Sequence, residues 1–327
     1  MSQRISYLML LSAISVSLMM GCFEKASGPD DGGTPAGPKY RITKSTTYNG
    51  SSVITSIVSY TYDAGNHVLI MRTGDCSNNL RAYVEYEYDN AGNKTKESNF
   101  AYRVATQDTP RTAYQVWTYD ANNKMTKHEK FLGSGTANGY ETWEYDASGH
   151  QIRWNNYALT ALSNYTTSQW SGDNLIRLTS YSGASVVQSI DTFSYDAQGH
   201  QLTSVKLHAD GTTWSYSVFT YDGSGNMLTE RRYEANGSLR GGTNNIWSGT
   251  LLTKSEQLDT AGAVSSTVTS TYNASGKKTE ELATNASGGQ TGRKTYTYDA
   301  NGNLTEYTER NALDAVTMRR VDEWEQY

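Results

Sequence analysis

A short aromatic motif recurs along the chain at a nearly constant spacing, and this repeat constrains the fold more than any other feature. Each copy reads aromatic–any residue–Tyr–Asp and is followed within a few residues by Gly, Asn, His or Lys. The aspartates of neighbouring copies, such as Asp63 and Asp89 or Asp120 and Asp146, are 26 residues apart. A spacing of this size indicates a repeat architecture in which each unit packs against its neighbours.

The chemistry of one copy predicts the end of a β-strand followed by a tight turn. Aromatic and threonine residues suit a pleated, half-buried strand. An aspartate in the first turn position can accept hydrogen bonds from the backbone N–H groups ahead of it. A glycine three residues later provides the positive φ of a type I turn with a bulge. The predicted turn-capping aspartates are Asp63, Asp89, Asp120, Asp146, Asp196, Asp222 and Asp299.

The two aromatic positions of each copy are two residues apart and therefore share one face of the strand. If the units stack, these positions form two aromatic columns. The column three residues before each Asp contains Tyr60, Tyr86, Trp117, Trp143, Trp170, Phe193, Phe219 and Tyr296. We expect these rings to pack against cross-strand neighbours. The functional alternative is a platform for sugar rings, with flanking Asn, Thr and Asp as hydrogen-bonding partners.

A second class of turn lies between the copies, for example at Asn49-Gly50 and Asn236-Gly237. Each unit is therefore two strands of about nine residues, each roughly 30 Å long. Eleven such units fit between Tyr40 and Tyr327. The sequence predicts an all-β antiparallel meander of about 22 strands. The Asp-x-x-Gly turns lie along one edge of the predicted sheet, and the second class of turn lies along the other edge. A hollow spiral, a closed sheet and a flattened two-layer sandwich remain alternatives.

The Tyr-x-Tyr-Asp-x-x-Gly copies resemble the YD repeat of the RHS family, over nearly all of residues 40–327. The resemblance implies that the sheet coils into a spiral or shell, as in that family. This chain is shorter than the large members and has no Asp-Pro-x-Gly motif of the kind that ends their shells. A toxin-associated shell is therefore the weaker functional reading.

The amino terminus predicts export and lipidation. Residues 1–21 contain Arg4 and an apolar stretch too short to span a membrane comfortably. This segment resembles a bacterial lipoprotein signal, which implies that Cys22 carries the lipid and that the protein is sorted to the outer membrane. Residues 22–39 are rich in Gly, Pro and Asp and predict a flexible tether. The domain would face the periplasm or the cell surface.

The sequence shows no catalytic or metal-binding signature. It has no paired His or Cys at metal-ligand spacing and no Gly-x-Ser-x-Gly elbow. The Asp299 turn lacks the glycine and the distal glutamate of a calcium-binding EF-hand loop. A net charge of −5 argues against a nucleic-acid partner. We therefore expect no cofactor, no metal and no enzyme activity.

Three functions follow from these observations. The first is a non-catalytic, membrane-anchored module that is surface-structural or binds a glycan. We expect exposed Trp154 and Trp214, which lie outside the columns, to be its platform residues. The second is a protein-interaction scaffold, since exposed strands and variable turns can bind a partner. The third and weakest is a polysaccharide-degrading enzyme.

Overall fold

The computed structural model describes residues 39–327, and between these residues it contains 22 β-strands and no helix. The predicted signal of residues 1–21, the lipidation residue Cys22 and nearly all of the predicted tether lie outside the described residues. Residues Tyr40–Tyr327 form one compact unit. No apolar helix of membrane-spanning length occurs in this part of the chain.

The strands follow one another with short connections. Their bounds are β1 Tyr40–Asn49, β2 Ile54–Tyr62, β3 Val68–Gly74, β4 Leu80–Tyr88, β5 Lys94–Ala101, β6 Arg111–Tyr119, β7 Met125–Leu132, β8 Ala137–Tyr145, β9 Gln151–Ala158, β10 Ala161–Ser171, β11 Asn174–Ser182, β12 Val187–Tyr195, β13 Gln201–His208, β14 Thr213–Tyr221, β15 Met227–Glu234, β16 Leu239–Ser248, β17 Leu251–Leu258, β18 Val264–Tyr272, β19 Lys278–Asn285, β20 Gln290–Tyr298, β21 Leu304–Asn311 and β22 Val316–Gln326.

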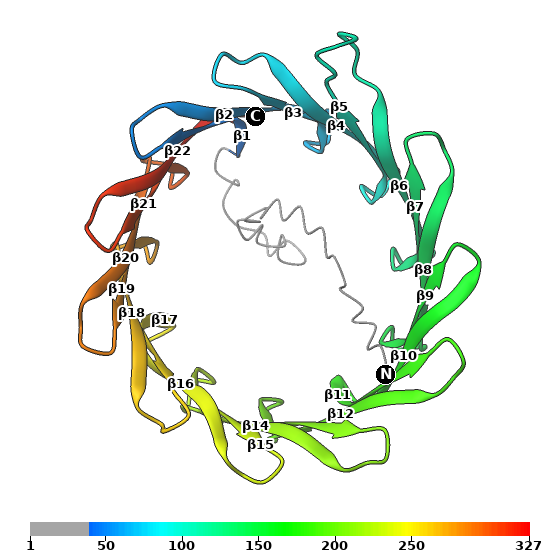
Figure 1. The fold of residues 1–327 in the computed structure, drawn as a ribbon, viewed down its shortest axis with the longest axis vertical. Coiled ribbons are helices and arrows are strands. Elements are labelled where there is room, and N and C mark those ends of the chain that lie inside the picture. The colour runs from blue at the N-terminus through cyan, green and yellow to red at the C-terminus, as the bar shows by residue number, and fades with distance from the viewer. Residues whose placement is uncertain (1–38) are drawn as a thin grey trace, which may run out of the picture. The chain divides into compact units, whose positions relative to one another are not determined.

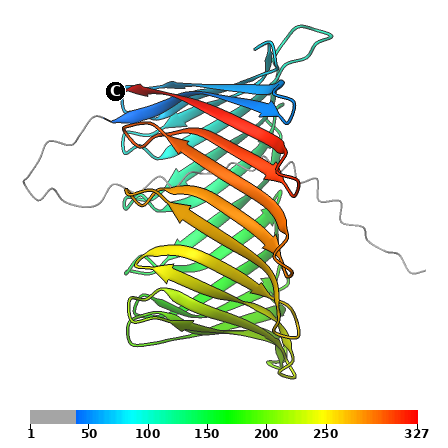
Figure 2. The ribbon, with the colours of Figure 1, turned by 90° about the vertical axis from the view of Figure 1, so that its left-hand side faces the viewer.

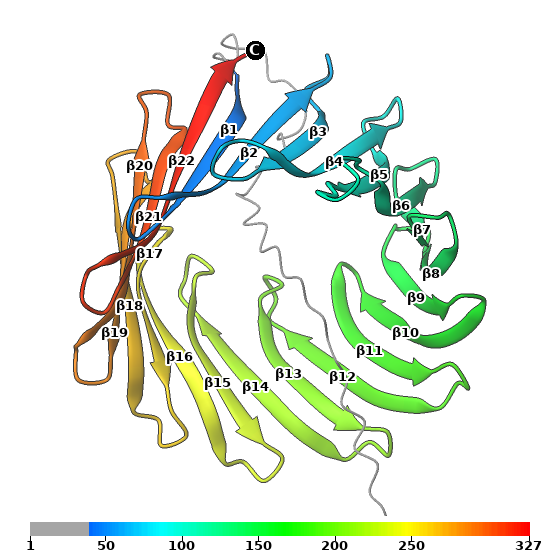
Figure 3. The same cartoon turned by 45° about the horizontal axis from the view of Figure 1, so that its top comes forward.

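The strands form a single closed antiparallel sheet (Figure 1). Each strand pairs with its neighbours in sequence, and β1 also pairs with β22, with Tyr40 opposite Gln326 and Asn49 opposite Met318. Figure 3 shows β1 between β2 and β22 at this closure. The all-β meander predicted from the sequence is confirmed. Of the three arrangements left open, the sheet adopts the closed one.

The turns lie at two opposite edges of the sheet (Figure 2). We call the edge with the turns that follow even-numbered strands the Asp-turn rim, and the opposite edge the variable-turn rim. In the turn at Asp89, the backbone N–H of Gly92 donates to the Asp89 carbonyl, and Gly92 has a φ of 82°. Asn66 and Asn123 adopt the same positive φ in the turns that lack this glycine. The tight turn predicted from the repeat is therefore present.

One aromatic residue near the end of every even-numbered strand donates a hydrogen bond to a backbone carbonyl at or near the start of the preceding strand. The eleven donors are Tyr62, Tyr88, Tyr119, Tyr145, Trp170, Tyr195, Tyr221, Trp247, Tyr272, Tyr298 and Trp324. The assignment of Trp170 to the other column was therefore wrong. Trp170 takes the tyrosine position because a shorter turn pairs Ser171 directly with Asn174.

A second aromatic row lies on the opposite face of the sheet, and the sequence reasoning missed it. In five units, a tyrosine lies five residues before the Tyr or Trp that donates the hydrogen bond described above. This tyrosine stacks on an aromatic residue of the next strand, with ring centroids 4.3 to 4.9 Å apart. The pairs are Tyr83–Phe100, Tyr114–Phe131, Tyr140–Tyr157, Tyr165–Tyr181 and Tyr216–Tyr233. The buried Ile57, Ile190 and Leu258 continue this row, so the apolar core is a narrow belt.

Candidate functional site

Four of the seven tryptophans gather on neighbouring strands, in the sector from β6 to β10. They are Trp117 on β6, Trp143 on β8, Trp154 on β9 and Trp170 on β10. Trp143 lies directly opposite Trp154 in the strand register, so the two rings share one face. Trp154 is half-buried, which corrects the expectation that it is solvent-exposed.

An open hollow of about 750 Å³ lies between two successive turns of the Asp-turn rim in this sector. We call it the Trp143 groove. Its aromatic lining is Trp143 and Tyr145. Its polar lining comes from the two turns and the strands beside them, and comprises Asp120, Asn122, Lys124, Thr126, Glu144, Asp146 and Ser148. Trp143 and Tyr145 lie on one face of β8 and Glu144 on the other, so the lining of the groove includes residues from both faces of this strand.

A lysine connects the two turns that border the groove. The ammonium of Lys124 donates to the backbone carbonyl of Gly149 at 2.8 Å and lies 5.3 Å from the centre of the Tyr145 ring. The Asp120 carboxylate accepts the backbone N–H groups of Asn122 and Lys124 at 2.8 and 2.9 Å. These contacts fix the spacing of the two turns and leave the Lys124 charge engaged.

The second turn carries a short chain of polar contacts. The Asp146 carboxylate accepts the His150 backbone N–H at 2.9 Å and lies 3.2 Å from the His150 ring. The other ring nitrogen of His150 lies 3.1 Å from the Asp173 carboxylate of the next turn, and the ring stacks on Trp170. The backbone hydrogen bond from His150 lowers the pKa of Asp146, which keeps this carboxyl ionised.

Tyr145, one of the residues that line the groove, is fixed by a hydrogen bond to the neighbouring strand β7. The Tyr145 hydroxyl donates to the Met125 carbonyl at 2.8 Å. Burial, and then the nearby Asp120 charge, raise the pKa of Tyr145, so its phenol stays neutral. Tyr145 is therefore a neutral ring that a hydrogen bond to β7 holds in place.

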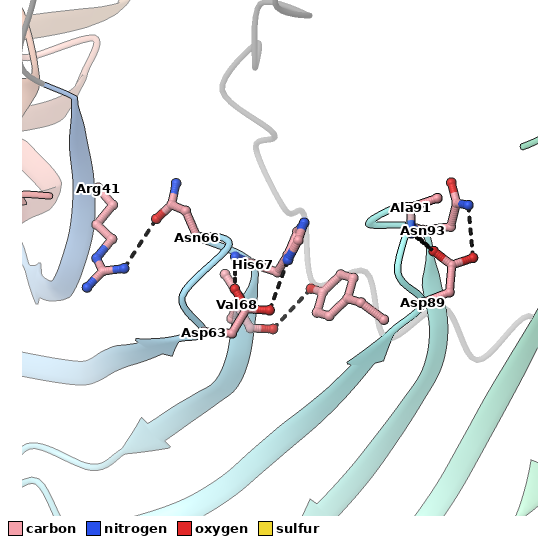
Figure 4. Close-up of polar contacts among 9 residues, drawn as sticks. Arg41, Asp63, Asn66, His67, Val68, Asp89, Ala91 and Asn93 are labelled. Atoms are coloured by element: carbon pink, nitrogen blue, oxygen red, sulfur yellow. Dashed lines mark hydrogen bonds and ion pairs between the residues drawn. The ribbon is translucent and has the colours of Figure 1, made fainter.

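The turn aspartates use their oxygens within their own turns (Figure 4). The Asp63 carboxylate bonds the His67 backbone and ring, and the Asp89 carboxylate bonds Ala91, Asn93 and the Asn93 side chain. Arg41 also reaches Asn66 of the first turn. Within residues 39–327, no three His, Cys, Asp or Glu side chains gather in a way that could hold a metal ion.

The two tryptophans singled out from the sequence do not form one platform. Trp214 on β14 is five strands away from Trp154 on β9, roughly 24 Å along the sheet. Trp214 is 49% exposed, stacks on His208 at 5.2 Å, and has the Lys206 ammonium 5.1 Å from its ring centre. It is a separate exposed aromatic near the variable-turn rim.

Sequence reasoning placed Trp143 in a packing column and did not anticipate the groove beside it. The Lys124 contact that joins the two turns links residues 25 positions apart and is not evident in one repeat. The sequence feature that could have indicated this region is the local enrichment of tryptophan between residues 117 and 170. The remaining column rings, such as Tyr60 and Tyr86, are half-buried, in agreement with a packing role.

Residues 195–238 match the family model RHS Repeat. No curated protein sequence matches the chain. Among solved structures, the TcdB2-TccC3-Cdc42 complex is similar at 10% identity and a TM-score of 0.32, over 80% of this chain and 18% of that one. A porin-like protein from Bacteroides uniformis is similar at 14% identity and a TM-score of 0.30, over 88% of this chain and 96% of that one. The chain thus spans about a fifth of the first of these.

Proposed function

We propose that this RHS-repeat chain is a non-catalytic, membrane-anchored surface module that binds a glycan in the Trp143 groove. The observation that carries the proposal is the open hollow of about 750 Å³ with Trp143 among its lining residues and two polar turns at its borders. The closed sheet acts as the rigid support, because the turns that form the groove are fixed by its strands.

A sugar fits this chemistry better than an apolar small molecule does. The C–H groups of a pyranose face can pack on an aromatic ring, while its hydroxyls need donors and acceptors around the edge. Asn122 and Ser148 are exposed turn residues of the groove lining and can provide these contacts. An apolar ligand would leave the same groups without partners, which costs binding energy.

A glycan array probed with the full-length protein tests this function. The expected result is saturable binding to at least one glycan, lost in Trp143→Ala and weakened in Asn122→Ala. Asn122 is an exposed turn residue, so its substitution leaves the fold intact. Loss in Trp214→Ala instead would move the site to the exposed aromatic near the other rim. No binding by the folded protein to any glycan would reject the function.

The membrane anchor is a separate part of the proposal and rests on the sequence of residues 1–22. Acylation of Cys22, with the Gly-, Pro- and Asp-rich stretch up to Lys39 as the connection, would hold the sheet close to the outer membrane. Labelling of cells with a palmitate analogue tests it. We expect a labelled product of the full chain that disappears in Cys22→Ser, and equal labelling of both would remove the anchor.

A protein partner is the second candidate function, and one observation favours it. Eight of the eleven turns of the variable-turn rim have an exposed large apolar side chain in or beside them. They are Val53, Val104, Leu132, Leu159, Val186, Trp214, Val264 and Leu313. Crosslinking in cells should then recover one stoichiometric protein, and the Leu159→Ser/Leu313→Ser variant should lose it.

A further inference from the structure

We infer that a hollow beside Lys294 on β20 binds a small zwitterion, such as a free amino acid with a short apolar side chain. The hollow has a volume of about 250 Å³ and is lined by residues of β18 to β22. Figure 1 shows these strands in orange to red, across the ring from β6 to β10. This Lys294 hollow shares no lining residue with the Trp143 groove, so the inference is independent of the proposed glycan site.

The hollow has an apolar floor of three small or medium side-chain positions. Val268 lies directly opposite Ala283, and Ala283 directly opposite Gly292, so the three share one face of the sheet. Every other odd-numbered strand has a polar side chain at the register position of Ala283, ranging in size from Ser180 to Arg232. The sheet is therefore unusually open and apolar at this point.

The glycine in this floor is not required by the backbone. A Cβ at Gly292 would make only an ordinary contact, 3.4 Å from the Arg310 carbonyl oxygen, and Gly292 has no positive φ. Gly139 and Gly241 occupy the same strand position in other units. They have φ of 106° and 133°, and a Cβ there would lie 2.6 and 2.7 Å from a carbonyl oxygen. The missing side chain of Gly292 thus serves to keep the hollow open.

A lysine with a glutamate on each side lies next to this floor. Lys294 is two residues from Gly292 and shares its face, and the register places Glu281 opposite Lys294 on β19 and Glu309 opposite it on β21. Opposite charges in such cross-strand positions usually pair. Among the residues that the structure describes, however, Lys294 forms no ion pair and no hydrogen bond, and Glu281 pairs with a different lysine.

Both glutamates are bonded to other groups. The Lys278 ammonium and the Tyr296 hydroxyl donate to the two oxygens of Glu281. The Tyr307 hydroxyl donates to one oxygen of Glu309, and the other oxygen has no partner within residues 39–327. Burial raises the pKa of Tyr296 and of Tyr307, so both phenols stay protonated and act as donors.

The two arginines of the lining do not add to this charge. Arg293 and Arg310 lie opposite each other and alternate to the other face of the sheet. There Arg293 lies 3.5 Å from the Asp314 carboxylate, and Arg310 donates to the Asp314 carbonyl. A ligand in the hollow therefore meets the Lys294 ammonium rather than an arginine cluster.

The groups left over in the hollow define the class of ligand. They are one ammonium, on Lys294, and one carboxylate oxygen, on Glu309, at positions whose Cβ atoms are about 5 Å apart. An amino acid has a carboxylate and an ammonium on adjacent carbons and can pair with both, while its apolar side chain covers Val268 and Ala283. A simple anion would be repelled by the two glutamates, and a simple amine would leave Lys294 without a partner.

Titration of the full-length protein with three probes of one shape tests the charge requirement. L-valine has both charges, isovalerate lacks the ammonium, and isobutylamine lacks the carboxylate. At neutral pH and about 0.05 M salt, followed by NMR of the ligand signals, we expect L-valine to bind at least about five-fold tighter than either analogue. Equal binding of isovalerate or of isobutylamine would overturn the assignment of a zwitterion.

Two substitutions place the binding in the hollow. Lys294→Met should lower the affinity for L-valine to that for isobutylamine and leave isobutylamine binding unchanged. Gly292→Leu should abolish binding of L-valine, because the new side chain fills the floor. Ser215→Leu is the matched control, since Ser215 occupies the strand position of Gly292 in the β14 unit, and it should bind L-valine like the parent protein.

The contrary results are equally definite. No saturable binding of L-valine by the folded parent protein overturns the inference. Undiminished binding by Lys294→Met, or an equal loss in Gly292→Leu and Ser215→Leu, overturns the assignment to this hollow. None of these results bears on glycan binding by the Trp143 groove.

Discussion

The hydroxyl of Tyr88 donates a 3.0 Å hydrogen bond to the backbone carbonyl of Val68, 20 residues earlier and on the neighbouring strand. Val68 precedes a β-bulge, where the strand register of β2 and β3 shifts by one residue. A bulge leaves backbone groups without ladder partners, and the tyrosine hydroxyl satisfies one of them. The same contact in all eleven units explains why the repeat keeps Tyr or Trp before the turn, since both rings can donate.

Removal of one such hydroxyl should destabilise the sheet modestly. Tyr88→Phe keeps the ring that stacks on His67 but deletes the donor. We expect a loss of about 1 kcal/mol in the free energy of unfolding, measured by urea denaturation. Tyr157→Phe is the control, because this ring is also stacked and the structure shows no hydroxyl partner for it among the described residues. Equal effects of the two variants would contradict the role of the hydroxyl.

Two glycines in one turn should respond differently to the same substitution. Gly225 has a φ of 84°, and a Cβ there would lie 2.6 Å from the His200 ring. Gly223 has open space around it and no positive φ. We expect Gly225→Ala to lower the free energy of unfolding by about 1–2 kcal/mol, because its backbone would be strained. Gly223→Ala should be neutral or slightly stabilising in the same assay.

A buried carboxylate on β22 makes a hydrogen bond across the closure of the sheet. Asp322 is 5% exposed, accepts the Ser45 hydroxyl of β1 at 2.6 Å, and pairs with Arg320 at 2.9 Å. Asp322→Ala leaves Arg320 without its partner and should cost about 3 kcal/mol in unfolding free energy.

Weakening of this closure should also expose two strand edges, which favours association. We therefore expect Asp322→Ala to form oligomers on size-exclusion chromatography. Glu323→Gln breaks only an exposed pair with Lys44 and should remain monodisperse, with an effect below about 1 kcal/mol. If Asp322→Ala behaved like Glu323→Gln, the closure would not depend on this carboxylate.

One histidine should make stability depend on pH. The hydrogen bond to Asp173 raises the pKa of His150 above its ordinary value. Because the pKa is higher in the folded state, the stabilisation is complete below the unfolded pKa of about 6.5 and is lost as the pH rises through the folded pKa. The denaturant midpoint of Asp173→Asn should therefore fall below that of the parent protein at about pH 5.5 and approach it by about pH 8.5. A difference independent of pH would contradict the assignment.

The local parts of this fold could be predicted from the sequence because each turn and strand is specified within one repeat. Trp324 was overlooked as a copy, although it lies 26 residues after Tyr298 and makes the same contact to a carbonyl. The second aromatic row was also overlooked, although Tyr83 and Tyr114 each lie five residues before a terminal tyrosine.

The long-range features could not be predicted in this way. Closure depends on how the twist and stagger of 22 strands accumulate until β1 meets β22, and no single repeat contains that information. The Trp143 groove requires two turns from different units and the Lys124 bridge between them. Sequence could identify the indole and the turn residues but not their proximity.

The most direct test of the central claim is isothermal titration of the array-selected glycan into the full-length protein and into Trp143→Ala. We expect saturable binding to the parent protein and an affinity at least ten-fold weaker in the variant, a loss of about 1.4 kcal/mol. Circular dichroism should show the same strand content in both proteins. Undiminished binding by folded Trp143→Ala would contradict the assignment of the groove.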